Sequence, residues 1–408
     1  MRFGREGGVL LPVAALPGGV LGDDALKFLD WMADAGQRWW QILPFGPPDE
    51  HGSPYAATSA FAGSPTWLAR PDARVTSAEI DELVATQGSW AAAWAAYAGP
   101  GALADQVRFA REWHRVREHA NARGVRILGD MAFAVAAGSA DHRATPEIFR
   151  PGFVGGVPPD DWSATGQRWG TPVYDWSELR RQGYRWWIER FARTFELVDA
   201  VRIDHFRGFV AAWLIPERNR TARAGRWTRG PGRAVFDATR AELGDLALVA
   251  ENLGLITPAV ERLRSELGLP GSVVMQFAFQ GDMVNRPPNE PTEHDVVYTG
   301  THDNDTTVGW WRGASEPQRA GVRRALDARG IVEDDPHWML TRLALASRGA
   351  ISIVPAQDLL GLGSEARTNT PGRATGNWRW RLPRGALTPA LAKRLRAETE
   401  ASGRLDNG

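Results

Sequence analysis

The 408-residue chain contains no cysteine and carries no net charge, because 48 Lys and Arg residues balance 48 Asp and Glu residues. Without cysteine it has neither a disulfide framework nor a thiolate metal site, which favours a reducing location such as the cytoplasm. The balanced charge argues against nucleic acid and against an anionic membrane as partners, because both attract basic proteins. No apolar run approaches the roughly 18 residues that a membrane-spanning helix needs.

The N-terminus has the outline of a secretory signal, since Arg2 and Arg5 precede an apolar run at 9–16. Pro12 interrupts that run, and the run continues directly into sequence with a folded pattern. A signal peptide needs a continuous apolar segment followed by a cleavage site of small residues. We therefore expect this segment to belong to the folded domain and the protein to be cytoplasmic.

Tyrosine is scarce and tryptophan is abundant, with 5 Tyr against 19 Trp. A tryptophan offers a flat apolar face and one N–H donor, which suit the C–H faces and hydroxyls of a sugar. Core packing accounts for an excess of tryptophan equally well, so composition alone does not identify a carbohydrate cleft. With 43% hydrophobic residues, the chain has enough apolar surface for one large α/β barrel or for two ordinary domains.

Short apolar runs rich in β-branched residues alternate with helical patterns, which is typical of a parallel sheet with crossover helices. The predicted strands are 9–13, 39–43, 125–129, 200–203, 246–250, 273–279, 296–299 and 351–354. The predicted helices are 24–35, 103–122, 184–197, 233–243, 258–267 and 317–328. Eight strands with helices between them predict a (β/α)₈ TIM barrel, with 1–408 as a single catalytic domain.

Two regions do not fit a minimal barrel. Residues 45–101 contain loops and a short helical pattern at 89–97, and residues 149–171 are rich in Gly, Pro and Trp without periodicity. Loops after barrel strands build the active-site face. We therefore expect an inserted subdomain at 45–101 and a loop at 149–171 that covers the active site. The tail at 397–408 is expected to fray.

Acidic residues follow four of the predicted strands directly or closely: Asp130, Asp204, Glu251 and Asp303. One such carboxylate is most often a helix N-cap or part of a structural ion pair. Four at the same end of different strands are harder to explain in that way, because burying a charge is costly unless it is paired or has a function. In a barrel, these positions face the active-site mouth.

Convergent carboxylates serve metal binding or glycosidic-bond chemistry. His205 and His302 lie beside two of them, so a metal site stays open as an alternative. Retaining glycosidases place two carboxyls about 5–5.5 Å apart, and neighbouring strands are about 4.8 Å apart. Asp204 and Glu251 therefore suit a nucleophile and an acid/base, with Asp303 stabilising the transition state. Arg202 lies two residues before Asp204 and favours its ionised form.

The sequence around these carboxylates resembles the amylomaltases, the 4-α-glucanotransferases or disproportionating enzymes of glycoside hydrolase family 77. The three central motifs are RIDHFRGF at 202–209, ENLGLITP at 251–258 and TGTHDNDTT at 299–307. Further similar segments are 18–63, GDM at 129–131, GQRWG at 166–170 and SEARTNTPG at 364–372. The resemblance covers nearly the whole chain except about 71–101.

This resemblance implies a (β/α)₈ barrel with inserted subdomains on its C-terminal face and no C-terminal β-sandwich. It implies retaining transfer of α-1,4-glucan segments between malto-oligosaccharides or other α-glucans, without a metal or other cofactor. It assigns Asp204 as nucleophile, Glu251 as acid/base and Asp303 as transition-state stabiliser. The residues expected to bind substrate are Tyr55, Asp130, Gln167, Trp169, Arg202, His205, Phe277, His302 and Asn369, and 162–169 would belong to the covering loop.

Two departures from the family pattern are visible. Asn252 stands where the family usually has Asp, and the long helical subdomain that usually precedes Gly124 is much shorter here. We therefore expect shorter oligosaccharide substrates and poor formation of large cyclic glucans. A hydrolase, a transferase for a modified oligosaccharide of secondary metabolism and a silent carbohydrate-binding protein remain alternatives, and the oligomeric state stays open.

Overall fold

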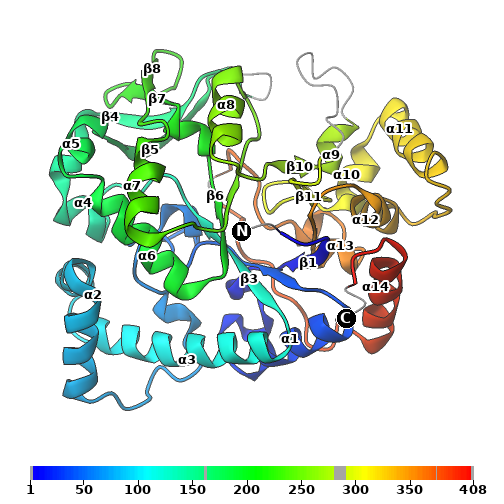
Figure 1. Cartoon of the computed structure of the whole chain (residues 1–408), viewed down its shortest axis with the longest axis horizontal. Helices are drawn as coiled ribbons and strands as arrows, with labels where there is room; N and C mark the ends of the chain where they lie inside the picture. Colours follow the sequence, from blue (N-terminus) through cyan, green and yellow to red (C-terminus); the bar gives the residue numbers. More distant parts are fainter. Residues whose placement is uncertain (1–2, 160–162, 280–290, 374, 406–408) are drawn as a thin grey trace. The chain divides into compact units, whose positions relative to one another are not determined.

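The structure is a computed structural model that describes residues 3–159, 163–279, 291–373 and 375–405. Eight parallel strands form the predicted (β/α)₈ barrel in the order β10-β11-β12-β1-β2-β3-β6-β9 (Figure 1). Their bounds are β1 (Glu6–Leu10), β2 (Trp39–Gln41), β3 (Arg126–Met131), β6 (Ala200–Ile203), β9 (Leu248–Ala250), β10 (Ser272–Val274), β11 (Val296–Tyr298) and β12 (Ile351–Pro355).

The helices follow the predicted alternation, and all six predicted helices are present to within one residue at each end. The helices at the predicted positions are α1 (Asp23–Asp34), α3 (Ala102–Ala122), α6 (Arg185–Leu197), α7 (Ala234–Leu243), α8 (Pro258–Glu266) and α11 (Glu316–Asp327). The others are α2 (Ser77–Ala98), α4 (Ala140–Ala144), α5 (Trp176–Arg181), α9 (Met275–Ala278), α10 (Thr307–Gly313), α12 (Pro336–Ala346), α13 (Ala356–Leu359) and α14 (Pro389–Ala401).

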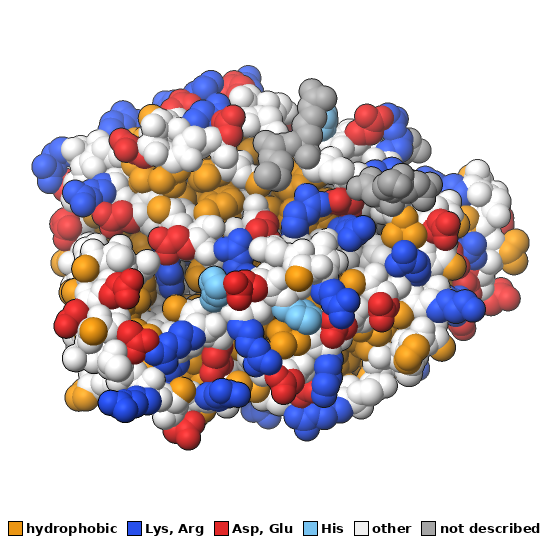
Figure 2. Space-filling view, turned by 60° about the horizontal axis from the view of Figure 1, so that its bottom comes forward, with side chains coloured by type: hydrophobic (Ala, Val, Ile, Leu, Met, Phe, Trp, Pro, Cys, Tyr) orange, Lys and Arg blue, Asp and Glu red, His pale blue; other side chains and the backbone are white. Residues whose placement is uncertain are grey.

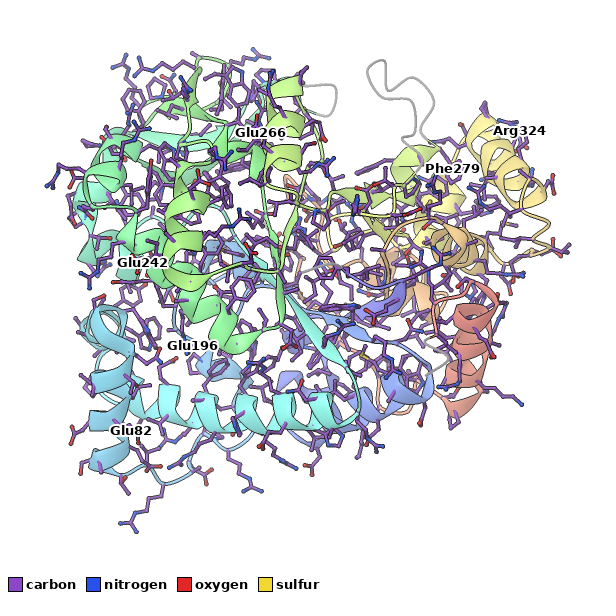
Figure 3. The ribbon with its side chains drawn as sticks, viewed as in Figure 1. Glu82, Glu196, Glu242, Glu266, Phe279 and Arg324 are labelled. Carbon is purple, nitrogen blue, oxygen red and sulfur yellow. The ribbon has the colours of Figure 1, made fainter. Side chains whose placement is uncertain are left out.

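The predicted strand at 273–279 is partly wrong. Only Ser272–Val274 pairs with the neighbouring strand, and Met275–Ala278 forms helix α9. A continuous apolar run carries no periodicity that separates a buried strand from a buried helical turn. After α9, Phe279 lies against α11, where a side chain at Gly321 would approach the Phe279 ring to 3.3 Å (Figure 3).

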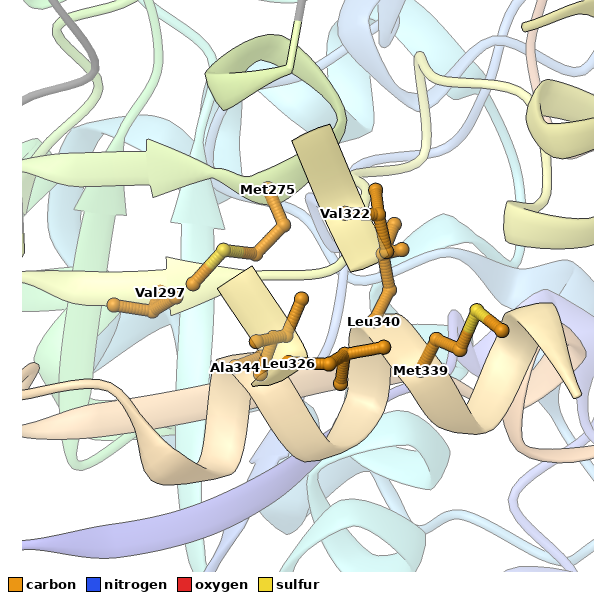
Figure 4. Close-up of a cluster of buried hydrophobic side chains, with 8 residues drawn as sticks. Met275, Val297, Val322, Leu326, Met339, Leu340 and Ala344 are labelled. Atoms are coloured by element: carbon orange, nitrogen blue, oxygen red, sulfur yellow. The ribbon is translucent and has the colours of Figure 1, made fainter. Parts of the chain in front are cut away.

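The chain divides into two compact units, and the first comprises Met1–Ile42, Val116–Leu128 and Pro270–Gly408. It contains β1, β2, β10, β11 and β12. In one of its core clusters, Met275 and Val297 meet apolar side chains of α11 and α12 (Figure 4). The cluster consists of Met275, Val297, Val322, Leu326, Met339, Leu340, Leu343 and Ala344. These helices thereby cover the strands that precede helix α9 and the segment at 299–307.

The C-terminal segment belongs to this unit and is ordered, so the prediction that 397–408 frays is wrong for the described residues up to 405. Helix α14 extends to Ala401, and the Arg404 side chain is fully buried. Its guanidinium donates to five backbone carbonyls, those of Glu6, Leu345, Ser347, Gly349 and Ala350, at 2.6–3.1 Å. The sequence does not indicate this burial, because charged residues in a polar tail usually stay in solvent.

The second unit comprises Leu43–Arg115 and Gly129–Leu269. Besides β6 and β9 it contains an antiparallel sheet in the order β5-β4-β7-β8, which the sequence analysis did not predict (Figure 1). Its strands are β4 (Phe149–Val157), β5 (Gln167–Tyr174), β7 (Ala211–Pro216) and β8 (Arg226–Arg229). The region at 149–171, predicted as a loop, is therefore largely a β-hairpin, and 160–162 of the expected covering loop lie outside the described residues.

Glycines in β4 obscured this hairpin. A side chain at Gly156 would come within 2.1 Å of the Gln167 carbonyl oxygen, and one at Gly155 within 2.8 Å of the Thr171 hydroxyl. These positions need glycine because the paired strand approaches closely. Glycine lowers strand propensity, so a pattern-based prediction reads such a strand as a loop.

Helix α2 is longer than the predicted pattern at 89–97. It begins with a capping box in which Thr76 and Glu79 satisfy each other's backbone amides, and Gly88, with φ 57°, interrupts it. Beyond Gly88, Trp90 stacks on Phe61 with ring centroids 6.4 Å apart. Gln87 of α2 donates to Glu196 of α6, which is labelled in Figure 3. Helix α2 is thus fixed to its unit by an aromatic contact and a hydrogen bond.

The surface is mixed in charge. On the face drawn in Figure 2, basic and acidic side chains are interspersed, and neither sign gathers into a large patch. This matches the balanced composition. Within the part of the chain that the structure describes, no helix combines the length and the apolar character needed to cross a bilayer.

Candidate active site

Three acidic residues of the second unit stand at the carboxyl ends of neighbouring strands. Ile203 of β6 is in register with Ala250 of β9, so Asp204 and Glu251 occupy the next register position. The Glu251 amide donates to the Ile203 carbonyl at 3.0 Å, and the Asp204 amide donates to the Met131 carbonyl at 3.0 Å. Strand spacing is about 4.8 Å, so these two carboxylates begin from adjacent backbone positions.

Arg202 joins two of the carboxylates. Its buried guanidinium donates through Nη1 to both oxygens of Asp130, at 2.8 and 2.7 Å, and its Nη2 lies 3.4 Å from Asp204 Oδ1. The Tyr55 hydroxyl donates to Asp130 Oδ2 at 2.7 Å. Burial lowers the pKa of Arg202, but Asp130, Tyr55, Asp204 and Glu251 outweigh it and raise that pKa well above its usual range. The guanidinium is therefore a permanent positive charge beside Asp204.

The loop after β6 contacts Glu251 through its backbone. The His205 amide donates to Glu251 Oε2 at 2.8 Å, and the Phe206 amide donates to the Glu251 carbonyl oxygen at 3.2 Å. His205 has φ 47° and ψ 48°, a left-handed conformation that is uncommon for a residue with a side chain. Asn252 turns to a different partner and donates to Glu261 Oε1 at 2.7 Å.

The imidazole of His205 lies beside the predicted cleft residues of the second sheet. Its ring is 4.8 Å from the Trp169 ring in an edge-to-face arrangement, and the Trp169 indole N–H donates to Gln167 Oε1 at 3.2 Å. Burial, and secondarily the charge of Arg207, lower the pKa of His205 to about 3. His205 is therefore neutral above pH 4 and can both donate and accept hydrogen bonds. Trp169 remains 39% exposed, which leaves part of its ring open for contact.

The first unit holds the fourth acidic residue, Asp303. Asn369 donates through Nδ2 to Asp303 Oδ1 at 2.6 Å, and Arg367 donates to the Asp303 carbonyl oxygen at 2.6 Å. The buried His302 has its Nε2 3.5 Å from Asp303 Oδ2, and its carbonyl accepts from the Asn369 amide at 3.0 Å. The Asp303 side chain is 47% exposed. The motifs at 299–307 and 364–372 thus meet around one partly exposed carboxylate.

A buried carboxylate that was not among the predicted site residues accepts hydrogen bonds from both ends of the segment at 299–307. Asp358, on α13, accepts from the Thr299 hydroxyl at 2.6 Å, the Thr307 amide at 2.7 Å and the Thr307 hydroxyl at 2.7 Å. Its complete burial raises its pKa. The signal was present in the sequence, because Asp358 follows the apolar strand β12 as the four recognised carboxylates follow theirs.

The predicted residues therefore fall into two groups. The second unit brings together Tyr55, Asp130, Gln167, Trp169, Arg202, Asp204, His205 and Glu251, and the first unit brings together His302, Asp303 and Asn369. Phe277 lies on α9 of the first unit and is partly buried. Among the described residues, no cluster of three or more His, Cys, Asp or Glu side chains has the geometry of a metal site.

Comparison with known proteins gives one consistent match. A family model described as 4-alpha-glucanotransferase matches residues 11–97 and 102–388. It includes 71–97, which the motif comparison had left out. The 4-alpha-glucanotransferase of Thermus thermophilus is 39% identical over 500 aligned residues, covering 99% of this chain and all of the relative. That of Synechocystis is 38% identical, covering 98% of each chain.

The solved structures agree with the sequence relatives. An amylomaltase from Streptococcus agalactiae, in complex with acarbose, superposes with a TM-score of 0.88 at 28% identity. That superposition covers 98% of this chain and 100% of the other. Amylomaltase from Corynebacterium glutamicum gives a TM-score of 0.82 at 17% identity, which is a likeness of fold.

Proposed function

Since the chain belongs to the 4-alpha-glucanotransferases of glycoside hydrolase family 77, we propose that it transfers α-1,4-glucan segments between malto-oligosaccharides by double displacement. The proposal assigns the nucleophile to Asp204, the acid/base to Glu251 and stabilisation of the oxocarbenium-like transition state to Asp303. The Asp303 assignment rests on its motif and on the partly exposed carboxylate that Asn369 orients.

The observation that carries the proposal is the adjacent placement of Asp204 and Glu251. They follow paired strands at the same register position. The spacing of neighbouring strands, about 4.8 Å, is close to the 5–5.5 Å that a retaining pair of carboxyls requires. An inverting pair needs a wider gap, about 6.5–9.5 Å, to admit a water molecule. Retention with a covalent intermediate is the chemistry that this spacing supports.

In the first step, an Asp204 oxygen attacks the anomeric carbon and the glycosidic C–O bond breaks. Glu251 gives its proton to the departing oxygen, and the shortened glucan leaves. In the second step, Glu251 takes the proton from a hydroxyl of the acceptor glucan, which attacks the same carbon and releases Asp204. The acceptor's new bond is again α. When water replaces the sugar acceptor, the same sequence gives hydrolysis.

The other residues have supporting roles in this proposal. Arg202, fixed by both oxygens of Asp130, places a positive charge 3.4 Å from the nucleophile. This charge favours the carboxylate as attacking group and as leaving group in the second step. Neutral His205 and the half-exposed ring of Trp169 offer a hydrogen-bonding partner and an apolar face to one sugar.

We further propose that the chain prefers short donors and acceptors. The family match is interrupted at 98–101, where Gly99 and Gly101 form the turn between α2 and α3 with φ 80° and 86°. The alignment with the Thermus protein spans 500 positions, which is more than the 408 residues of this chain. A smaller inserted subdomain offers less surface to a long glucan.

Incubation with maltotriose tests the activity. A transferase gives glucose and a ladder of longer sugars, whereas a hydrolase gives glucose and maltose and a binding protein gives neither. Asp204→Asn is expected to lower turnover by about four orders of magnitude or more while the thermal transition stays near that of the wild type. Early products should keep the α configuration by NMR, and a β product would exclude double displacement.

A further inference from the structure

Arg207 is a buried arginine close to the proposed nucleophile. The proposed mechanism does not use the contacts of this arginine. It lies on the short helical turn η6 (Phe206–Phe209), three residues after Asp204, and is 7% exposed. Among the described residues, no carboxylate forms an ion pair with it, and its buried Nε has no hydrogen-bond partner. A buried cation without a counterion is costly, which suggests that the position has a use.

The partners that Arg207 does have come from two other segments. Its Nη1 donates to the backbone carbonyl of Leu255, and its guanidinium carbon lies 3.9 Å from the centre of the Trp227 ring. Trp227 stands on β8 and packs edge-to-face on Trp213 of β7, with ring centroids 5.1 Å apart. Arg207 therefore joins the loop after β6 to the second sheet and to the segment after β9.

The segment after β9 begins with Glu251 and leads to α8. Near its start, the amides of His205 and Phe206 donate to the Glu251 carboxylate and carbonyl. Four residues further on, Arg207 holds the Leu255 carbonyl. The two loops are thus fastened at two points, and the acid/base carboxyl lies at one of them. Such double attachment also explains how His205 keeps its left-handed conformation, which persists only where neighbouring contacts fix it.

We propose that Arg207, stacked on Trp227, is a positioning residue that sets the place of the Glu251 carboxyl as proton donor. This proposal rests on the proposed function, because it takes Glu251 as the acid/base. Burial lowers the pKa of the Arg207 guanidinium, and its charge in turn contributes to the lowered pKa of His205. The Trp227 ring stabilises the cation where water is excluded. Loss of either partner would free the Leu255 end of the segment.

Two donors separate a positioning role from a general structural one. Maltotriose needs a proton on the departing oxygen, whereas α-maltotriosyl fluoride releases fluoride with little help from an acid. The variants to be tested are Arg207→Met and Trp227→Leu. For each, kcat/KM on maltotriose should fall roughly 10- to 100-fold, because a misplaced acid loses much of its effect. For fluoride release, kcat/KM should stay within about threefold of the wild type, since that step does not depend on the acid.

The controls use the same sheet. Arg226, also on β8, lies over Phe153 at 5.0 Å and makes a matched arginine–aromatic pair away from Leu255. Arg226→Met should leave both donors unaffected, and Trp227→Phe should restore most of the activity lost in Trp227→Leu. Because Trp227 is 38% exposed, its variants carry the test even if Arg207→Met does not fold.

Equal losses with both donors would overturn the positioning role, and so would unchanged use of maltotriose by the Trp227→Leu variant. Failure of the underlying function looks different. In that case the wild-type protein itself would neither release fluoride nor transfer sugar from maltotriose.

Discussion

Arg202 and Arg404 are both buried, and they have opposite kinds of partner. Arg202, at 4% exposure, faces the carboxylates of Asp130 and Asp204 at the carboxyl ends of β3 and β6. Arg404, at 0% exposure, faces the Ser347 hydroxyl and five carbonyl oxygens, including that of Glu6 at the start of β1 and that of Ala350 just before β12. In TIM barrels, the carboxyl ends of the strands carry function and the amino ends carry stability.

The difference shows how a buried charge can be interpreted from its partners. Carbonyl oxygens accept the hydrogen bonds of a guanidinium but do not act as nucleophiles or acids. Arg404 therefore links the C-terminal segment to two strands of its unit. Carboxylates are themselves reactive groups, so a guanidinium among them organises a set of charges. We therefore expect Arg202 to support the proposed catalysis and Arg404 to support folding, and both expectations can be tested by removing the charge.

The largest effect is expected at Arg202. Arg202→Met should lower turnover about 1,000-fold or more, because a preorganised charge beside the reacting carboxylate is lost. It should also destabilise the protein, because the buried Asp130 carboxylate loses its counterion. Of the side chains described in contact with Asp130 here, the Tyr55 hydroxyl then remains. The double variant Arg202→Met/Asp130→Asn removes the uncompensated charge. We expect it to regain stability in urea unfolding without regaining turnover, and recovery of both would mean that Arg202 acts only in folding.

Arg404→Met should have the converse result. It removes the donor for five carbonyls, and the free energy of unfolding should fall by about 3 kcal/mol, as expected when several buried acceptors lose a charged donor. Activity per folded molecule at 25 °C should equal that of the wild type. Arg396→Met, on the exposed side of α14, is a suitable control for charge. A loss of specific activity in Arg404→Met would contradict the division between the two arginines.

Asn369→Ala extends the comparison to the carboxylate of the first unit. Asn369 donates to Asp303 at 2.6 Å, and a hydrogen bond to a charged group contributes about 1.5–3 kcal/mol. If that energy serves to hold Asp303 for the transition state, kcat should fall about tenfold or slightly more with a small change in stability. Asn377→Ala, which removes an amide bonded to Thr370 and Arg373, provides the control. An unchanged kcat would show that Asp303 needs no orientation by Asn369.

The sequence predicted the barrel, and the placement of acidic residues at its strand ends, better than it predicted the parts that surround them. Most barrel strands lie in short apolar runs, and Asp204 and Glu251 follow β6 and β9 without a gap. The second sheet was missed because Gly155 and Gly156 weaken the strand signal in β4. Arg207 and Arg404 could not be identified, because their burial depends on segments distant in the chain, namely Trp227 in one case and Gly349 in the other.

The smallest expected effect concerns a site residue that carries no charge. The pKa of His205 is about 3 in the folded state, below the 6.5 of an unperturbed histidine, because burial disfavours the imidazolium. The unfolded chain therefore binds more protons than the folded one between these values, and the free energy of unfolding decreases as pH falls through this window.

Between pH 7 and pH 5.5, His205 should account for about 1 kcal/mol of that decrease. His205→Gln should lose correspondingly less stability on acidification, measured by urea unfolding at both pH values, with His114→Gln at an exposed position of α3 as control. Equal acid sensitivity in His205→Gln and the wild type would mean that the imidazole takes up a proton as readily in the folded protein as in the unfolded chain. The proposed role of the neutral imidazole as a hydrogen-bonding partner of the sugar would then fail.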